Sequence, residues 1–137
     1  MSGISLRGEL FTLVRTKSLC GMESIEFLRH LRTQVASRHG ERLLVVWDRS
    51  PIHRAAPVQE FLTEEARESV ITEFLPPYAP DLNPDEGVWQ HLKHVELSNV
   101  CCWNLAELNY ELGLAIRRLR AQPHLIQSFF GQAGLAL

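Results

Sequence analysis

"RLLVVWD", residues 42–48, is a continuous apolar run that ends in an acid. Gly40 precedes the run and Pro51 follows it, so it is short and has turn residues on both sides. A short apolar run of this kind is typical of a strand that is buried on both faces of a sheet. We therefore predict a buried strand that ends at Trp47 and places Asp48 at its carboxyl end.

A second strand is predicted further along the chain, at "VITEFL", residues 70–75. A helix is predicted between the two strands, from about residue 54 to residue 67. Pro57 is compatible with this helix only in its first turn, where proline is tolerated. Two strands joined by a helix normally form a parallel pair with a right-handed crossover, so residues 42–75 predict a parallel pair.

The flanking segments predict further strands and helices. Residues 4–7 and 10–14 predict two extended pieces or a hairpin around Gly8. Apolar residues recur at helical spacing in four other segments, which predict helices over residues 22–38, 84–97, 105–120 and 124–130. Asn104 is a good N-cap for the third of these helices. Together the segments predict one compact α/β domain, residues 1–137, with a helical C-terminal end.

The composition is that of an ordinary globular protein, with 45% hydrophobic and 22% charged residues among 137. No apolar run approaches the roughly 20 residues of a membrane span, and the first ten residues have no signal-peptide pattern. Three cysteines, two of them neighbours, favour a reducing compartment over a disulfide framework. We therefore expect a cytoplasmic protein. The net charge of −2 lacks the basic excess of a stand-alone nucleic-acid binder, so any DNA contact would use local patches.

Two acids follow the predicted strands, Asp48 directly and Glu86 after the proline-rich loop "PPYAPDLNP", residues 76–84. Ligands bind at the carboxyl ends of strands in open α/β sheets, and adjacent strands would bring the two carboxylates to the same edge. Carboxylate oxygens are the ligands that Mg²⁺ prefers, and such ions can activate water in phosphodiester cleavage. The sequence therefore predicts a metal site at Asp48 and Glu86.

Glu86 also has a purely structural explanation. Asn83 suits a helix N-cap and Pro84 the first helical position, so Glu86 would complete a capping box by reaching back to a backbone N–H. Glu86, Gln90 and Lys93 lie on one side of the predicted helix, opposite an apolar face formed by Val88, Trp89, Leu92 and Val95. Lys93 could therefore contact a phosphate near Glu86. The two roles of Glu86 are compatible, because a residue of the first turn can also bind a metal.

"VVWDRSPIHR", residues 45–54, and "FLPPYAPDLNPDEGVWQHLK", residues 74–93, resemble the catalytic half of DDE-type transposases. The resemblance is closest to the bacterial insertion-sequence branch related to the mariner superfamily. It implies an RNase H-like fold, a mixed sheet flanked by helices, and DNA cleavage and strand transfer that depend on Mg²⁺ or Mn²⁺. The second catalytic Asp of the family falls on Asp48 and its third acid on Glu86. We expect Arg49, His53 and Lys93 to contact the DNA substrate, and the protein to act at the bacterial nucleoid.

The chain departs from the family pattern at several positions. Many members have Asn where this chain has Arg49, and some have Ile where it has Asp85. The family's first catalytic Asp has no counterpart here, because no Asp precedes Asp48 and Glu9 lies in a turn. The helix-turn-helix of such proteins has no counterpart either. We therefore expect the C-terminal part of a transposase, truncated or split, that lacks the first strand of the fold.

Three functions remain open at this point. The chain could be part of an active transposase, or an inactive remnant that only associates with full-length transposase subunits. It could also be a related nuclease that uses Glu9 or Asp85 as a further acid. His53 could orient Asp48, contact substrate or cap the following helix.

Two other groups of residues allow more than one role. Arg117, Arg118 and Arg120 could complement the dipole at the end of their helix or bind phosphate. Tyr78 is expected to brace the proline-rich loop rather than to stack on a base.

Overall fold

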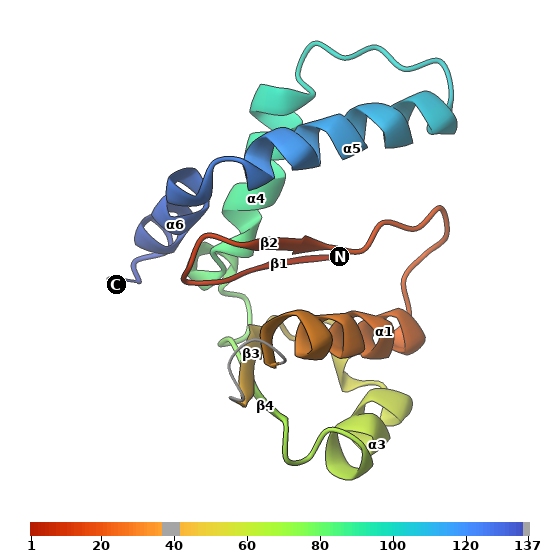
Figure 1. Ribbon diagram of the computed structural model, residues 1–137, viewed down its shortest axis with the longest axis vertical. Helices are drawn as coiled ribbons and strands as arrows, with labels where there is room; N and C mark the ends of the chain where they lie inside the picture. The colour runs from red at the N-terminus through yellow and green to blue at the C-terminus, as the bar shows by residue number, and fades with distance from the viewer. Residues whose placement is uncertain (37–41, 136–137) are drawn as a thin grey trace. The chain divides into compact units, whose positions relative to one another are not determined.

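The computed structural model describes residues 1–36 and 42–135, and these form two compact units (Figure 1). Unit 1 consists of Met1 and Leu13–Ala79, and unit 2 consists of Ser2–Thr12 and Pro80–Leu137. Within the described residues, four strands form two two-stranded sheets, one in each unit, and helices accompany both. The predicted α/β class is therefore confirmed, whereas the single domain with one RNase H-like mixed sheet stays a prediction. No helix in this part of the chain is long and apolar enough to cross a membrane.

Unit 1 is built from a parallel pair of strands and the helices that pack on one face of it. Its elements are α1 (Gly21–Leu31), the π-helical segment η1 (Arg32–Ala36), β3 (Leu43–Trp47), the 3₁₀ helix η2 (Pro51–Arg54), α3 (Ala56–Glu64) and β4 (Val70–Phe74). Leu43 lies opposite Val70 and Trp47 opposite Phe74. The predicted parallel pair is therefore confirmed. The helix predicted from residue 22 is confirmed by α1 and η1, and its predicted end at residue 38 lies outside the described residues.

Only one face of this sheet is buried, and the prediction of burial on both faces was wrong. Leu43, Val45 and Trp47 point toward a core made by α1 and α3, in which Leu28 and Val58 are almost fully buried. The alternate residues on β3 remain exposed, Leu44 to 58% and Val46 to 55%. Successive side chains of a strand point to opposite faces, so a helical layer on one side buries only every second residue. A continuous apolar run does not reveal this alternation.

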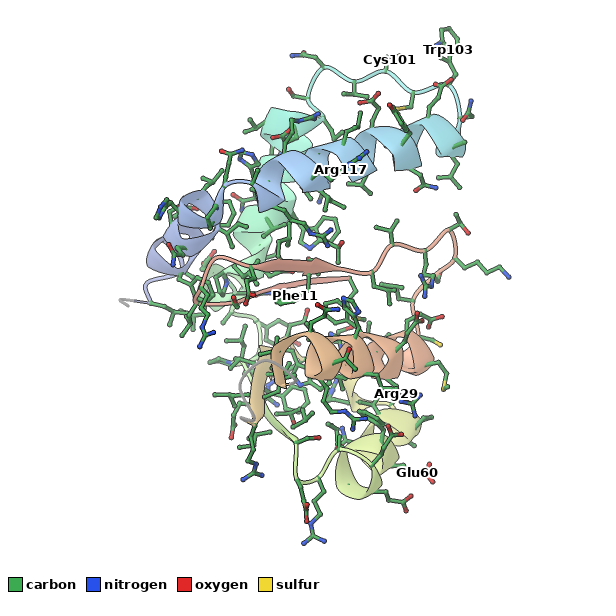
Figure 2. All side chains as sticks on the ribbon, in the orientation of Figure 1. Phe11, Arg29, Glu60, Cys101, Trp103 and Arg117 are labelled. Carbon is green, nitrogen blue, oxygen red and sulfur yellow. The ribbon has the colours of Figure 1, made fainter. Side chains whose placement is uncertain are left out.

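Charged side chains join the end of α1 to the end of α3. Nε of Arg29 donates to Oε1 of Glu65 at 3.1 Å, and its Nη2 donates to Oε2, so the guanidinium binds the carboxylate through two nitrogens. The same guanidinium lies over the ring of Phe61, 5.2 Å from its centroid. Figure 2 labels Arg29 among the side chains of unit 1. Two parallel charge-assisted bonds fix both the distance and the orientation of the two side chains. This contact therefore links α1 to the C-terminal end of α3.

Unit 2 combines an antiparallel hairpin with the helical end of the chain. Its elements are β1 (Ser2–Ile4), β2 (Leu10–Thr12), the 3₁₀ helix η3 (Pro80–Leu82), α4 (Asp85–His91), the π-helical segment η4 (Leu92–Glu96), α5 (Leu105–Arg120) and α6 (Pro123–Gln132). Gly8 lies between the two strands with a φ of 79°, a conformation that glycine adopts without strain. The hairpin predicted around Gly8 is therefore confirmed.

The helix α5 is anchored at both ends. Oδ1 of Asn104 accepts from the backbone N of Glu107 at 2.9 Å, which confirms the predicted N-cap. At the other end, Nε of Arg120 donates to the carbonyl of Leu10 at 2.9 Å and its Nη2 donates to Oγ1 of Thr12 at 2.9 Å. Arg120 therefore ties α5 to the hairpin.

The π-helical segment η4 changes which residues face the core of unit 2. The apolar face predicted for this helix included Val95, but Val95 is exposed and Glu96 is largely buried instead. In η4 the backbone N of Leu97 donates to the carbonyl of Leu92, five residues earlier, at 3.0 Å. This wider turn rotates the later residues away from their α-helical positions. Glu96 accepts from Nε of Arg118 at 2.6 Å, so its buried charge is paired.

Glycine is required where α4 meets α6. A Cβ on Gly87 would lie 2.7 Å from the ring of Phe129, whereas a Cβ on Gly113 of α5 would meet nothing within 4 Å. We expect Gly87→Ala to destabilise the protein by about 1–3 kcal/mol through overpacking. The matched change Gly113→Ala should stabilise it by up to about 1 kcal/mol, because alanine is the better helix former. Urea unfolding followed by circular dichroism measures the free energy of unfolding of both variants. If the two substitutions changed this free energy equally and in the same direction, the packing described for Gly87 would be contradicted.

The Arg29–Glu65 contact predicts a pH-dependent contribution to stability. Hydrogen bonds from Arg29 hold the pKa of Glu65 below its ordinary value of 4.5. A carboxyl with a lowered folded-state pKa contributes stability above its unfolded pKa and loses it as the pH falls through the folded pKa. Glu65→Gln should therefore lower the urea midpoint at neutral pH, and the difference from wild type should disappear in acid. Glu64→Gln, at an exposed neighbouring position, should change the urea midpoint little at either pH. If Glu65→Gln lowered the midpoint as much in acid as at neutral pH, this role of Glu65 would be contradicted.

Candidate functional site

Asp48 lies directly after β3, at the carboxyl end of the parallel strand pair. Its side chain is 54% exposed. Oδ1 accepts a hydrogen bond from the backbone N of Ser50 at 2.8 Å, which forms a local turn around the carboxylate. Within the described residues, Oδ2 has no hydrogen-bond partner. One oxygen of Asp48 is therefore fixed by the backbone, and the other is available to a ligand.

His53 lies in η2, five positions after Asp48, and the structure brings the two side chains together. Nε2 of His53 is 3.4 Å from Oδ1 of Asp48, and the imidazole is buried. The ring stacks on Trp47, with centroids 4.4 Å apart and planes inclined by 20°. Burial lowers the pKa of His53, while the charge of Asp48 acts in the opposite direction. The neutral imidazole is therefore favoured, with its edge rather than its face directed at Asp48.

Ser24 of α1 completes this contact and was not found from the sequence. It is fully buried, and its Oγ lies 3.3 Å from Nδ1 of His53. Ser24 is 29 positions before His53, so no local motif connects them. The available signal was a small polar residue one helical turn before the buried Leu28, at a position where the helical period places core residues.

Arg49 is held against the neighbouring strand. Its Nε donates to the carbonyl of Leu75 at 3.0 Å, and its guanidinium carbon lies 5.9 Å from the centroid of the Phe74 ring. The side chain is exposed, and its Nη1 and Nη2 form no hydrogen bond with the described residues. Arg49 therefore places a positive charge at the sheet edge next to Asp48.

Glu86 lies in unit 2, in the first turn of α4. This helix begins at Asp85, and Oδ1 of Asn83 accepts from the backbone N of Asp85 at 3.2 Å. The predicted capping box is not formed, because Glu86 makes no side-chain hydrogen bond among the described residues. The N-cap is Pro84 instead of the predicted Asn83, and it makes no side-chain cap hydrogen bond. The helix therefore begins without using the carboxylate of Glu86 as a cap.

The two other acids considered in the sequence have structural contacts. Asp85 is turned into unit 2, where its Oδ2 accepts from Oγ of Ser2 at 2.6 Å, and burial raises its pKa. Glu9 accepts from Oγ of Ser5 at 2.9 Å within the hairpin turn. Neither side chain presents a free carboxylate in the way that Asp48 does.

The predicted site residues are divided between the two units. Asp48, His53 and Arg49 lie together in unit 1, whereas Glu86 and Lys93 lie in unit 2, with Lys93 exposed on η4. The convergence of Asp48 and Glu86 therefore stays a prediction. Over residues 1–36 and 42–135, no group of three or more His, Cys, Asp or Glu side chains is arranged to hold a metal ion.

The remaining candidate residues have mixed outcomes. Tyr78 is fully exposed and has a φ of 56°, so it does not brace the proline-rich loop as expected. Of the three arginines at the end of α5, Arg118 and Arg120 make contacts within unit 2, with Glu96 and with the hairpin. Arg117 is exposed and remains the arginine of this group best placed to meet a phosphate.

Comparison with known families identifies the chain. The model of the family described as DDE superfamily endonuclease matches residues 1–101, which include Asp48, His53, Glu86 and Lys93. Neither the search of curated proteins nor the search of solved structures gave a match. The endonuclease family acts on DNA and generally uses divalent metal ions. Because the matched region covers 101 of 137 residues, the chain belongs to the DDE superfamily endonuclease family.

Proposed function

We propose that this chain provides two carboxylate ligands, Asp48 and Glu86, of a DNA transposase that depends on Mg²⁺ or Mn²⁺. The enzyme would belong to the bacterial insertion-sequence branch related to the mariner superfamily, and it would cleave DNA strands and transfer them to target DNA. The observation that carries this proposal is Asp48, whose Oδ1 is fixed while its Oδ2 is free at the carboxyl end of a parallel strand pair. Ligand sites of open α/β sheets lie at this edge.

The donor atoms suit the proposed metal. Asp48 and Glu86 offer only carboxylate oxygens, and Mg²⁺ is usually held by one or two carboxylates together with substrate phosphates. In the proposed RNase H-like arrangement, Glu86 would join Asp48, and a third acid would come from another segment or subunit. When bound, such ions activate the attacking oxygen and stabilise the leaving oxygen in phosphodiester cleavage.

The basic side chains of the site would position the DNA. Arg49 keeps its terminal nitrogens free while its Nε holds the carbonyl of Leu75, so it can contact a phosphate from a fixed position. Lys93 is exposed and would make a second phosphate contact. Since the net charge of the chain is −2, binding of the DNA backbone would depend on such local contacts. The burial of His53 favours a role in orienting Asp48 over a direct contact with DNA.

A second candidate function is association with full-length transposase subunits without catalysis by this chain. The observation that favours it is the exposed apolar face of the unit 1 sheet, formed by Leu44, Val46 and Ile71. An apolar surface of this kind is typical of contact surfaces between proteins. Both functions use the same fold, and they differ in whether Asp48 is needed for DNA cleavage.

Metal binding tests the proposal independently of cleavage. Asp48→Asn keeps an oxygen for the backbone N of Ser50 but removes the charge that binds the ion. We expect the affinity for Mn²⁺, measured by electron paramagnetic resonance of the free ion, to fall by more than the roughly 10- to 100-fold typical of outer-shell changes. Asp81→Asn removes the same charge at an exposed position of η3 and should leave the affinity unchanged.

The same measurement tests Glu86. We expect Glu86→Gln to weaken Mn²⁺ binding as well, with Glu64→Gln in unit 1 as the matched control. An unchanged affinity in Asp48→Asn would contradict the metal site. An effect of Asp48→Asn without an effect of Glu86→Gln would contradict the convergence of the two acids.

Nicking of supercoiled DNA in Mn²⁺ then separates the two candidate functions. Robust cleavage by the chain that Asp48→Asn abolishes would rule out the non-catalytic role. Absence of cleavage by the chain, together with binding to full-length transposase subunits whose cleavage is the same with the wild-type chain and with Asp48→Asn, would support that role.

A further inference from the structure

Three side chains of unit 1, from α1, η2 and the end of β3, form a continuous polar line through an otherwise apolar region. Oγ of Ser24 lies 3.3 Å from Nδ1 of His53, and Nε2 of His53 lies 3.4 Å from Oδ1 of Asp48. We propose that Ser24 is a positioning residue: its hydrogen bond with Nδ1 fixes the orientation of the His53 ring, so that the Nε2 edge stays on Oδ1 of Asp48 and Oδ2 faces the metal. This inference rests on the proposed metal site at Asp48.

The chemistry of the three groups selects one arrangement of hydrogens. An ionised carboxylate only accepts hydrogen bonds, so a lone pair on Nε2 would face Oδ1 of Asp48 unfavourably. The hydrogen of the neutral ring therefore belongs on Nε2, and Nδ1 must accept. A serine hydroxyl can donate or accept, so Ser24 can satisfy Nδ1 only by donating. Ser24 is fully buried, and among the described residues its hydroxyl forms a hydrogen bond with no other side chain than His53. The hydroxyl therefore depends on His53 for its hydrogen bond.

The imidazole cannot easily leave this position. Trp47 stacks on one face of the ring, which fixes its plane. The backbone around His53 is also held, because its N donates to the carbonyl of Ser50 at 3.1 Å and its carbonyl accepts from Nε2 of Gln59 at 3.4 Å. Stacking alone would allow a half-turn about the Cβ–Cγ bond, which keeps the plane of the ring but exchanges its nitrogen and carbon atoms. The hydrogen bond with Ser24 and the 3.4 Å contact of Nε2 with Asp48 oppose this half-turn.

The same three residue types occur in hydrolase triads, but the geometry excludes that role for Ser24. A nucleophilic hydroxyl must reach substrate, and Ser24 is fully buried inside the unit 1 core. The exposed end of the line is Asp48, so any ligand meets the carboxylate and not the hydroxyl. Ser24 and His53 therefore act on the reaction through Asp48. Contacts of this kind are often long in the free protein and tighten when ligand binds.

The hydrogen position is tested by nuclear magnetic resonance of the six histidines labelled with ¹⁵N in the ring, with the His53 signals assigned through His53→Gln. In the wild type we expect His53 to carry its hydrogen on Nε2 and its Nδ1 to accept a hydrogen bond. Ser24→Ala should leave the hydrogen on Nε2 but move the ¹⁵N signal of Nδ1 to that of an acceptor without a hydrogen bond, while the circular dichroism spectrum stays the same. Ser69→Ala, which also removes a hydroxyl hydrogen bond in unit 1, should leave the His53 signals unchanged.

The effect on the metal site is tested with Mn²⁺ binding. We expect Ser24→Ala to weaken binding about tenfold, as is typical when an outer-shell partner is lost. His53→Gln keeps an N–H donor for Asp48 but removes the ring nitrogen Nδ1, with which Ser24 forms its hydrogen bond. In the His53→Gln background, Ser24→Ala should therefore have no further effect on Mn²⁺ affinity, whereas a purely structural role of Ser24 would persist there.

The outcomes separate this inference from the proposed function. A His53 hydrogen on Nδ1 in the wild type, or a Ser24→Ala protein with a wild-type Nδ1 signal and wild-type affinity, would overturn the role of Ser24. If the wild type binds no Mn²⁺, the proposed metal site fails, and the inferred effect of Ser24 on it falls with it. A changed Nδ1 signal in Ser24→Ala would then still show that Ser24 holds the His53 ring.

Discussion

The parallel register of β3 and β4 is the constraint on which the site in unit 1 depends. It places Trp47 opposite Phe74, so the two strands end at the same level and Asp48 and Leu75 leave the sheet together. The backbone N of Leu75 donates to the carbonyl of Trp47 at 2.9 Å, which continues the pairing to the edge. A shift of one residue would send Trp47 to the exposed face and remove the ring on which His53 stacks. The position of the carboxylate thus follows from the packing of the sheet.

The polar line from Ser24 to Asp48 depends on the apolar residues around it. His53 stacks on Trp47, and Trp47 in turn lies 5.9 Å from the Phe74 ring, so three rings form a continuous layer under the site. Within the described residues, the buried Nε1 of Trp47 has no hydrogen-bond partner, which costs on the order of 1–3 kcal/mol. Trp47 is therefore held by ring packing rather than by a polar contact. Burial among these rings also lowers the pKa of His53.

Local features of the fold could be predicted from the sequence, and long-range ones could not. The parallel pair, the hairpin at Gly8 and the cap at Asn104 follow from patterns within a few residues. The exposed face of β3 and the π-helical shift that exposes Val95 depend on which neighbours cover an element, and a single sequence does not contain that information.

The same limit applies to the site. Asp48 and its contact with His53 lie within one short motif and were accessible as a hypothesis, although the role of His53 was left open. Ser24 reaches the site only because α1 packs on the strand pair, so no spacing in the chain points to it. The division into two units likewise depends on tertiary contacts, because segments far apart in the sequence join each unit.

Arg49 shows how a departure from the family pattern can be compatible with a metal site. A guanidinium next to Asp48, where many family members have a neutral amide, could compete with a cation for the carboxylate. Here the carbonyl of Leu75 and the ring of Phe74 hold the guanidinium toward β4, so it forms no ion pair with Asp48 among the described residues. Opposite charges attract less as their separation grows and as water screens them. Arg49 can therefore add positive potential for a DNA phosphate while Oδ2 of Asp48 stays available.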